Sequence, residues 1–183
     1  MSGRIIVTED ITLDGVVDVG ADDPGLSNWT GSFKRGPEGD KFKLDELRGA
    51  GALLLGRKTY DAFAGYWPNA KDDYAKPINS LPKYVASHRE AAWDPTTVIN
   101  GDLAAAVRAL KERVDGDILV YGSASIVHQL APWGLIDVYH LMIYPTVVGR
   151  GKRLFPDGFA AKFKTEEVRT LGDGIVFMRY RLA

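Results

Sequence analysis

Short apolar runs alternate along the chain with segments whose apolar residues recur at helical spacing. Short apolar or β-branched runs predict strands at residues 4–8, 52–55, 83–87, 96–100, 117–121 and 138–144, of which 52–55 and 117–121 are typical of buried strands. Helical spacing predicts helices at residues 42–48, 59–63, 103–114 and 125–130. The third helix follows Asp102, a residue type that is favoured at the N-cap. Strands that alternate with helices indicate a largely parallel sheet covered on both faces.

Two segments depart from this alternation. Residues 10–39 are rich in Gly, Asp, Ser and Pro, and they predict a long loop of the kind that often carries function. Residues 164–170 and 175–182 predict a closing antiparallel hairpin that turns at Gly172-Asp173-Gly174. We therefore expect an α/β fold with a mostly parallel sheet and a C-terminal antiparallel hairpin, in one domain spanning residues 1–183.

Composition narrows the classes of function. The chain has 183 residues, no cysteine and a net charge of −1. Disulfides, thiol nucleophiles and cysteine zinc sites are therefore excluded, and the missing basic excess argues against nucleic acid as a partner. No apolar stretch approaches the roughly 18 residues of a membrane span, and the first ten residues do not resemble an export signal. We expect a cytoplasmic protein without a membrane partner.

Two predicted strand-to-helix junctions, at residues 53–60 and 118–125, carry the candidate chemistry. Each places small or hydroxyl residues at the carboxyl end of a buried strand, the edge at which open α/β sheets bind ligands. A helix that begins there offers free N–H groups to phosphate oxygens. Nearby cationic side chains for a further phosphate are Arg57, Lys58, His88 and Arg89. The alternative is that both junctions are simple tight turns.

Other familiar motifs are missing from the sequence. Gly149-Arg150-Gly151 lacks the third glycine of a dinucleotide fingerprint, and there is no P-loop and no His-Glu-x-x-His pair. The segment at residues 122–125 is not a nucleophile elbow, because no glycine stands two residues after either serine. His88, His128 and His140 show no metal-binding spacing, so we expect no metal.

Five motifs in one order carry a resemblance that covers nearly the whole chain. They are Thr12-Leu13-Asp14-Gly15-Val16, Leu54-Leu55-Gly56-Arg57-Lys58-Thr59-Tyr60, Leu81-Pro82-Lys83-Tyr84-Val85-Ala86-Ser87, Leu119-Val120-Tyr121-Gly122-Ser123 and Val147-Val148-Gly149-Arg150-Gly151-Lys152-Arg153-Leu154-Phe155. With them the chain resembles the dihydrofolate reductase superfamily. It is more similar to the group formed by the C-terminal reductase domain of the bifunctional riboflavin-biosynthesis deaminase-reductase and its stand-alone relatives. This resemblance implies a dihydrofolate-reductase-like fold of three layers.

The resemblance also implies a cofactor and its site. NADPH would lie across the carboxyl edge of the sheet and reduce a pterin or pyrimidine ring. The matching cofactor-binding positions are Gly56, Arg57, Lys58, Thr59, Ser87, His88, Arg89, Gly122, Ser123, Ala124 and Ser125. Residues 13–16 match the loop beside the nicotinamide. Folate reductases usually have Gly-Gly, often joined by a cis peptide, where this chain has Gly122-Ser123.

The remaining candidates lie around the substrate. The family carries one acid on its first helix, and counting back from Gly56 without gaps places Asp40 there, with Glu38 and Asp45 as rivals. A solvated or helix-capping carboxylate is the alternative for Asp40. Asp14 is a candidate proton relay or plain turn chemistry. Leu13, Trp29 and Phe33 are candidate substrate contacts, because planar rings stack on aromatic side chains, although core or dimer contacts are the alternative for the two aromatics.

Three hypotheses follow for function. The first is an NADPH-dependent reductase of a pterin-like or pyrimidine-like small molecule; in its riboflavin version the substrate is 5-amino-6-(5-phosphoribosylamino)uracil. The second is an NADPH-binding regulatory or vestigial protein without turnover. The third is a structural domain whose junctions are only turns. The resemblance leaves a homodimer open.

Overall fold

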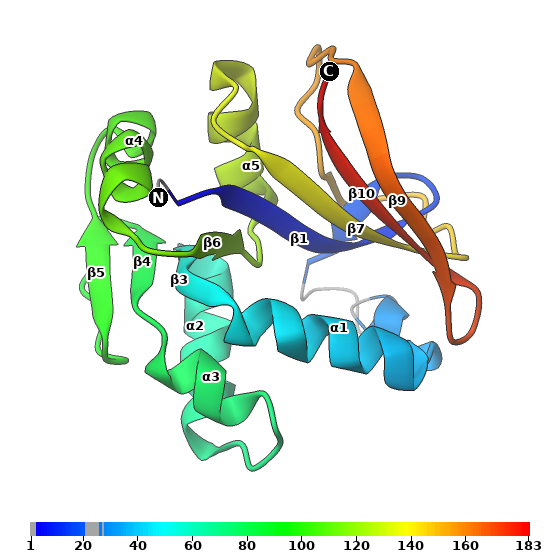
Figure 1. The fold of residues 1–183 in the computed structure, drawn as a ribbon, viewed down its shortest axis with the longest axis horizontal. Helices are drawn as coiled ribbons and strands as arrows, with labels where there is room; N and C mark the ends of the chain where they lie inside the picture. Colours follow the sequence, from blue (N-terminus) through cyan, green and yellow to red (C-terminus); the bar gives the residue numbers. More distant parts are fainter. Residues whose placement is uncertain (1–2, 21–25, 27) are drawn as a thin grey trace.

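The computed structural model describes residues 3–20, 26 and 28–183, and its main feature is an eight-stranded mixed sheet (Figure 1). The strands are β1 (Ile5–Thr12), β3 (Ala50–Gly56), β4 (Lys83–Ala86), β5 (Thr96–Ile99), β6 (Asp117–Val120), β7 (Val138–Tyr144), β9 (Phe163–Leu171) and β10 (Ile175–Leu182). Their order across the sheet is β5-β4-β3-β6-β1-β7-β10-β9. The first six in this order are parallel, and β10 pairs antiparallel with both neighbours, so the fold class and the closing hairpin are confirmed.

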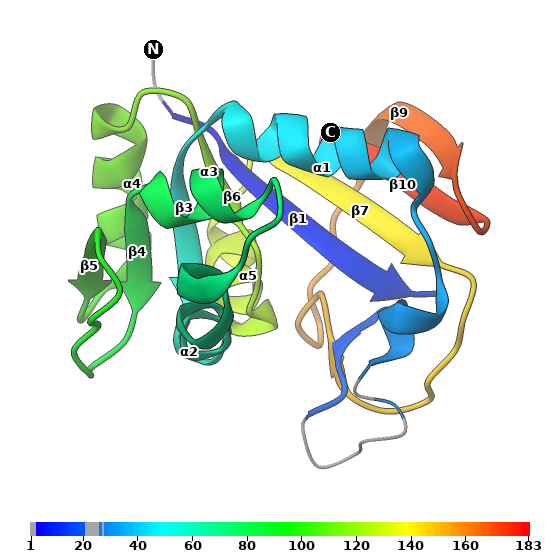
Figure 2. The ribbon, with the colours of Figure 1, turned by 90° about the horizontal axis from the view of Figure 1, so that it is seen from below.

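Helices cover both faces of the sheet (Figures 1 and 2). One layer holds α1 (Gly36–Arg48), α2 (Arg57–Tyr66) and α3 (Ala75–Ser80), and the other holds α4 (Leu103–Arg113) and α5 (Ala124–Leu130). Short 3-10 helices are η1 (Trp29–Ser32), η2 (Trp67–Asn69) and η3 (Ala131–Trp133). A separate two-stranded sheet joins β2 (Val16–Asp18) to β8 (Lys152–Arg153). The three-layer arrangement is the one predicted.

The two hydrophobic cores follow from the alternation of side chains along the strands. In β1, Ile5 and Val7 pack against α4 and α5, while Ile6 packs into the core beneath α1, α2 and α3. Because both faces of the central strands are covered, these strands read in the sequence as continuous apolar runs. Asp102 caps α4 as predicted, since its side chain accepts a hydrogen bond from the Ala105 amide at 3.0 Å.

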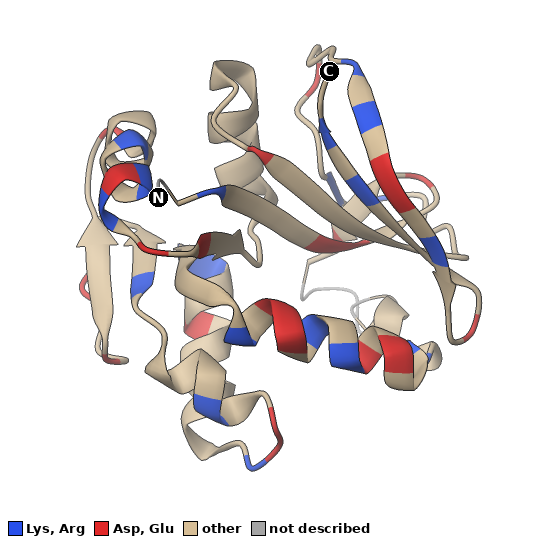
Figure 3. Cartoon of the chain, in the orientation of Figure 1, with Lys and Arg blue, Asp and Glu red and all other residues tan. Residues whose placement is uncertain are grey.

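The predicted loop at residues 10–39 was wrong in its extent. The strand β1 continues to Thr12, β2 follows, η1 begins at Trp29, and α1 begins at Gly36 with a proline in its first turn. The polar residues at the end of β1 conceal the strand, because they interrupt the apolar pattern. In Figure 3 charged residues are frequent along α1 and the β9–β10 hairpin, whereas β1 carries charge near its two ends.

The end of β1 forms a crevice in the sheet. Pairing between β1 and β6 stops at Val7 and Val120, but pairing between β1 and β7 continues to Thr12. The carbonyl of Arg4 accepts a hydrogen bond from Ile118 on the β6 side. Backbone groups alternate sides along a strand, so beyond the last pair with β6 the C=O group of Thr8 and the N–H and C=O groups of Asp10 face the gap. Open α/β sheets bind ligands at such a point.

Candidate functional site

The two predicted junctions meet at this crevice. The Gly56 amide, where β3 ends, donates a hydrogen bond to the Gly122 carbonyl at 3.1 Å. A Cβ atom on Gly56 would lie 2.3 Å from Ser123 Oγ, so this approach requires glycine. Ser123 and Ser125 share a hydrogen bond between their hydroxyls. The fold therefore brings together residues 56–59 and 122–125, which the sequence placed in one site.

Gly122 shapes the floor of the crevice. Its φ of +89° lies in the region that favours glycine, and the peptide that joins it to Ser123 is cis. A Cβ atom here would lie 3.1 Å from Thr59 Oγ1 and 3.5 Å from Glu9 Oε1. A hydroxyl and a carboxyl thus border the open side of this glycine.

The predicted phosphate-binding cations form an ion cluster around Asp61. Its carboxylate lies 2.7 Å from the Arg57 guanidinium and 3.0 Å from that of Arg89, and these arginines hold the pKa of Asp61 below its usual value. Arg57 also donates hydrogen bonds to the carbonyls of Arg89 and Glu90, at 3.3 and 2.6 Å. Ser87 Oγ accepts a hydrogen bond from the Arg89 amide at 3.0 Å. The structure brings Arg57 together with Ser87 and Arg89, although Arg57 and Arg89 are 32 positions apart in the sequence.

Lys58 and His88 lie apart from this cluster and have other partners. Lys58 Nζ lies 2.9 Å from Asp18 Oδ2, so the pair links the start of α2 to β2. His88 Nδ1 and Asn100 Oδ1 form a hydrogen bond of 2.6 Å.

Asp14 organises the loop after β1. Its carboxylate accepts hydrogen bonds from Thr12 Oγ1 at 2.6 Å and from the Gly149 amide at 2.8 Å. The first of these bonds is the main cause of the lowered pKa of Asp14, which disfavours a proton donor. The neighbouring Leu13 is 64% exposed. The predicted segments at residues 12–16 and 147–155 are joined here, and Asp14 stabilises the loop that joins them.

Two adjoining cavities lie beside the crevice. Their volumes are about 360 and 470 Å³, and both are lined by Asp10, Thr30 and Arg35. Trp29 lines the first cavity, and Phe33 lines the second. Both rings contact the Tyr144 ring edge-on, with a centroid distance of 5.3 Å for Trp29 and 5.6 Å for Phe33. The two predicted substrate aromatics therefore border one hollow.

Asp40 lies at the outer rim of this hollow. Its side chain is 58% exposed, and it pairs with Arg35 at 3.3 Å. Because α1 begins at Gly36, Asp40 lies in the second turn, so the alternative of a helix cap was wrong and a largely solvated carboxylate is observed. The rivals also lie in exposed ion pairs, Glu38 with Arg169 and Asp45 with Lys41.

The carboxyl groups next to the crevice come from β1 instead. Burial raises the pKa of Asp10, which Lys43 and Arg35 partly offset, and the Tyr144 hydroxyl hydrogen-bonds to it. Burial, together with the nearby charge of Asp10, raises the pKa of Glu9 to about 8. Glu9 Oε1 is shielded from solvent and has no hydrogen-bond partner among the described residues. Perturbed carboxyl groups of this kind are typical of functional sites.

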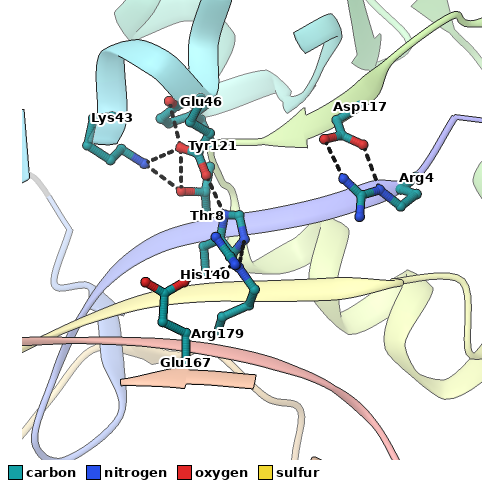
Figure 4. A network of polar contacts seen from close by, with 9 residues as sticks. All are labelled: Arg4, Thr8, Lys43, Glu46, Asp117, Tyr121, His140, Glu167 and Arg179. Carbon is teal, nitrogen blue, oxygen red and sulfur yellow. Dashed lines mark hydrogen bonds and ion pairs between the residues drawn. The ribbon is translucent and has the colours of Figure 1, made fainter. Parts of the chain in front are cut away.

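A buried polar network supports the hollow from below α1 (Figure 4). Lys43 Nζ donates hydrogen bonds to Thr8 Oγ1 and, at 2.8 Å, to Glu46 Oε2, and it lies 4.5 Å from the centre of the Tyr121 ring. The Glu46 side chain is 4% exposed, yet its pKa is lowered to about 2 because Lys43 and His140 outweigh the effect of burial. This network holds one ammonium group at the wall of the cavity.

His140 links Glu46 to β10. Arg179 Nε donates a hydrogen bond to His140 Nε2 at 3.0 Å. His140 Nδ1 and Glu46 Oε1 form a hydrogen bond of 2.6 Å. His140 thus anchors Glu46.

Four site residues were missed in the sequence: Glu9, Asp10, Lys43 and Glu46. The sequence did carry a signal for Glu9 and Asp10, because these two consecutive acids follow an apolar strand and precede the apolar Ile11. The charged residues of α1 gave no such signal, because most of their neighbours on this helix are solvated.

The mixed sheet, its central crevice and the glycine cradle define a dihydrofolate-reductase-like domain. Residues 4–177 match the RibD C-terminal domain family, and the chain belongs to that family. Membership makes it by class a reductase-type domain of the riboflavin-biosynthesis kind.

Known relatives agree with this assignment. The chain is 31% identical to the uncharacterized protein YyaP of Bacillus subtilis strain 168, over 97% of this chain and 94% of YyaP. A Shewanella sp. PV-4 protein that carries a riboflavin-biosynthesis assignment superposes with a TM-score of 0.79 at 17% identity, over 100% and 99% of the two chains. The Thermotoga maritima diaminohydroxyphosphoribosylaminopyrimidine deaminase/5-amino-6-(5-phosphoribosylamino)uracil reductase gives a TM-score of 0.65 at 17% identity, over 100% of this chain and 57% of that one. At these identities the two structures establish the fold alone.

Among the described residues, no helix is both long enough and apolar enough to cross a membrane.

Proposed function

We propose that this protein is an NADPH-dependent reductase of a pterin-like or pyrimidine-like heterocycle. The observation that carries the proposal is the meeting of residues 56–59 and 122–125 at the crevice beside β1. Gly56 and Gly122 allow the two turns to pack closely there, since a Cβ atom on Gly56 would lie 2.3 Å from Ser123 Oγ and one on Gly122 would lie 3.1 Å from Thr59 Oγ1. Glu9 Oε1 is a shielded polar atom that lacks a partner among the described residues. A glycine-containing turn at the carboxyl edge of the sheet and an unpaired polar atom fit a bound dinucleotide.

The residues that would hold the cofactor follow from this geometry. Gly56, Thr59 and residues 122–125 would contact the pyrophosphate and the nicotinamide end, while Arg57 and the loop at residues 87–89 would contact the adenosine 2′-phosphate. Lys58 would lie at the entrance. When bound, the reduced nicotinamide supplies a hydride, and the protein supplies orientation and a dry pocket.

Around the substrate, the chain offers a hollow that is lined by Asp10 and by aromatic rings. Trp29, Phe33 and Tyr144 provide apolar walls that exclude water from a planar ring. Asp10 would accept a hydrogen bond from a ring N–H and hold a proton near the reacting atoms, since burial raises its pKa. We assign this role to Asp10 in preference to Asp40, which is exposed, and Asp14, which is bonded to loop amides.

The riboflavin version of the proposal names 5-amino-6-(5-phosphoribosylamino)uracil as substrate. Support comes from the family and from the Thermotoga neighbour whose name includes this activity. A pyrimidine of this kind presents ring N–H and C=O groups to Asp10 and to the backbone edge of Thr8.

Binding and turnover test the proposal separately. NADPH and NADH are titrated into the purified protein by calorimetry, with Arg57→Ala beside the wild type. We expect NADPH to bind and the variant to bind it about tenfold more weakly, through loss of a charged contact. Loss of NADPH absorbance is then followed with dihydropterins and aminopyrimidines. Absence of nucleotide binding would refute the proposal, whereas binding without turnover of any substrate would support the regulatory alternative.

A further inference from the structure

The Glu9 carboxyl is a shielded polar group at the crevice whose hydrogen-bond partner the proposed function does not name. Its Oε1 atom is shielded and has no hydrogen-bond partner among the described residues. Leaving a buried acceptor unpaired is costly, so such a group at a crevice indicates a missing partner.

The surroundings of Glu9 point to a ligand as that partner. Glu9 Oε1 and Thr59 Oγ1 both border the open side of Gly122, where a Cβ atom would meet each of them. The charges that act on Glu9 are those of its neighbour Asp10, of Lys43 on α1 and of Asp18 on β2, and Asp18 is itself paired with Lys58. No cation among the described residues forms an ion pair with the Glu9 carboxyl. Burial raises the pKa of this carboxyl to about 8, so the group is mostly protonated at pH 7.

A neutral carboxyl has a specific hydrogen-bonding character. It presents one O–H donor beside one C=O acceptor, whereas a carboxylate only accepts. A primary amide presents the complementary pair, a C=O acceptor beside an N–H donor. The two groups therefore form two parallel hydrogen bonds, which fix the orientation of both planes.

We propose that Glu9 is a positioning residue that pairs through its neutral carboxyl with the primary carboxamide of a bound nicotinamide. This inference rests on the proposed function. It assigns to a side chain of β1 the task of setting which face of the nicotinamide ring is turned toward the substrate hollow.

The test is the pH dependence of nucleotide binding. Between about pH 6.5 and about pH 9 we expect NADPH binding to the wild type to weaken about tenfold, as Glu9 loses its proton. Glu9→Gln keeps a donor beside an acceptor and does not titrate, so its affinity stays constant over the same range. Glu9→Leu binds about tenfold more weakly throughout, since it loses both hydrogen bonds.

Two ligands act as matched controls. Adenosine 2′,5′-bisphosphate has no nicotinamide, so it binds all three proteins equally at each pH. The 3-acetylpyridine analogue of NADPH lacks the amide N–H and keeps only the carbonyl acceptor, so the difference between wild type and Glu9→Leu becomes smaller than with NADPH. Thermal unfolding of each variant verifies that it is folded.

The outcomes separate this inference from the proposed function. An identical pH profile for wild type and Glu9→Gln, or a loss of adenosine bisphosphate binding in Glu9→Leu, would overturn the role of Glu9 and leave NADPH binding intact. Unchanged NADPH affinity with lowered kcat would also overturn it, because Glu9 would then act on the substrate. Failure of NADPH to bind the wild type would overturn both.

Discussion

Replacing Glu46 by Gln removes one charge from the buried network while keeping the size of the side chain. Lys43 then loses its carboxylate partner beneath α1, and the amide offers one acceptor oxygen where Lys43 and His140 each had one. An unpaired ammonium in this position is costly, because it remains desolvated without a compensating charge. We expect Glu46→Gln to fold but to be much less stable than the wild type.

Two independent considerations give the size of the expected loss of folding stability in Glu46→Gln. The pKa of Glu46 falls from 4.5 to about 2 on folding. A tenfold change in proton affinity is worth about 1.4 kcal/mol, so the ionised carboxylate contributes about 3 kcal/mol at pH 7. Breaking a buried ion pair by removing one partner costs about 3–5 kcal/mol, which agrees. Since the folded-state pKa is the lower one, this contribution is complete above the unfolded pKa and is lost as the pH falls toward about 2.

The assay is urea unfolding followed by circular dichroism, with Asp45→Asn as the matched control. Asp45 lies next to Glu46 on the same helix, but its pair with Lys41 is exposed. We expect a loss of about 3 kcal/mol for Glu46→Gln at pH 7 and less than about 1 kcal/mol for the control. The difference between wild type and Glu46→Gln narrows at acid pH. Equal losses for the two variants, or a difference that grows as the pH falls, would refute the reasoning.

Three further substitutions test the site. Asp10→Asn lowers kcat about 100-fold in a steady-state reductase assay, whereas Asp40→Asn changes it less than about threefold. The reverse order would show that the functional acid is Asp40 on α1. Asp61→Asn removes a negative charge beside the proposed 2′-phosphate, so calorimetry should show a larger ratio of NADPH to NADH affinity, and an unchanged ratio contradicts this. Gly122→Ala lowers stability by about 1–2 kcal/mol in thermal unfolding and weakens NADPH binding, because its φ is positive; wild-type values for both would show that the cradle tolerates a side chain.

The order of strands and helices could be predicted because it depends on local patterns. Buried strands such as β3 read as apolar runs, and the cap at Asp102 marks the start of α4. The end of β1 could not be predicted in this way, since Thr8, Glu9 and Asp10 are polar in the sequence and their partner strand β7 lies far along the chain. Pairing with β7 extends β1 through these polar residues, and the local sequence pattern does not show this pairing.

The site shows the same division. Gly56 and Gly122 could be recognised from their positions after buried strands, because that edge is a general property of the fold. The acid was placed at Asp40 by counting, but counting does not show which side of α1 faces the sheet. Lys43 and Glu46 look like an ordinary surface pair in the sequence, and only the packing of α1 over β1 buries them.

The uneven pairing of β1 also determines how its amide hydrogens exchange with solvent. The amides of Val7 and Glu9 point toward β7, and the Thr8 amide closes the last pair between β1 and β6 at Val120, whereas the Asp10 amide points into the crevice. Exchange along β1 should therefore be slow as far as Glu9 and fast at Asp10, where the neighbouring strand is missing. A ligand that fills the crevice takes the place of that strand for Asp10. Its arrival can be read from one backbone hydrogen, with no turnover.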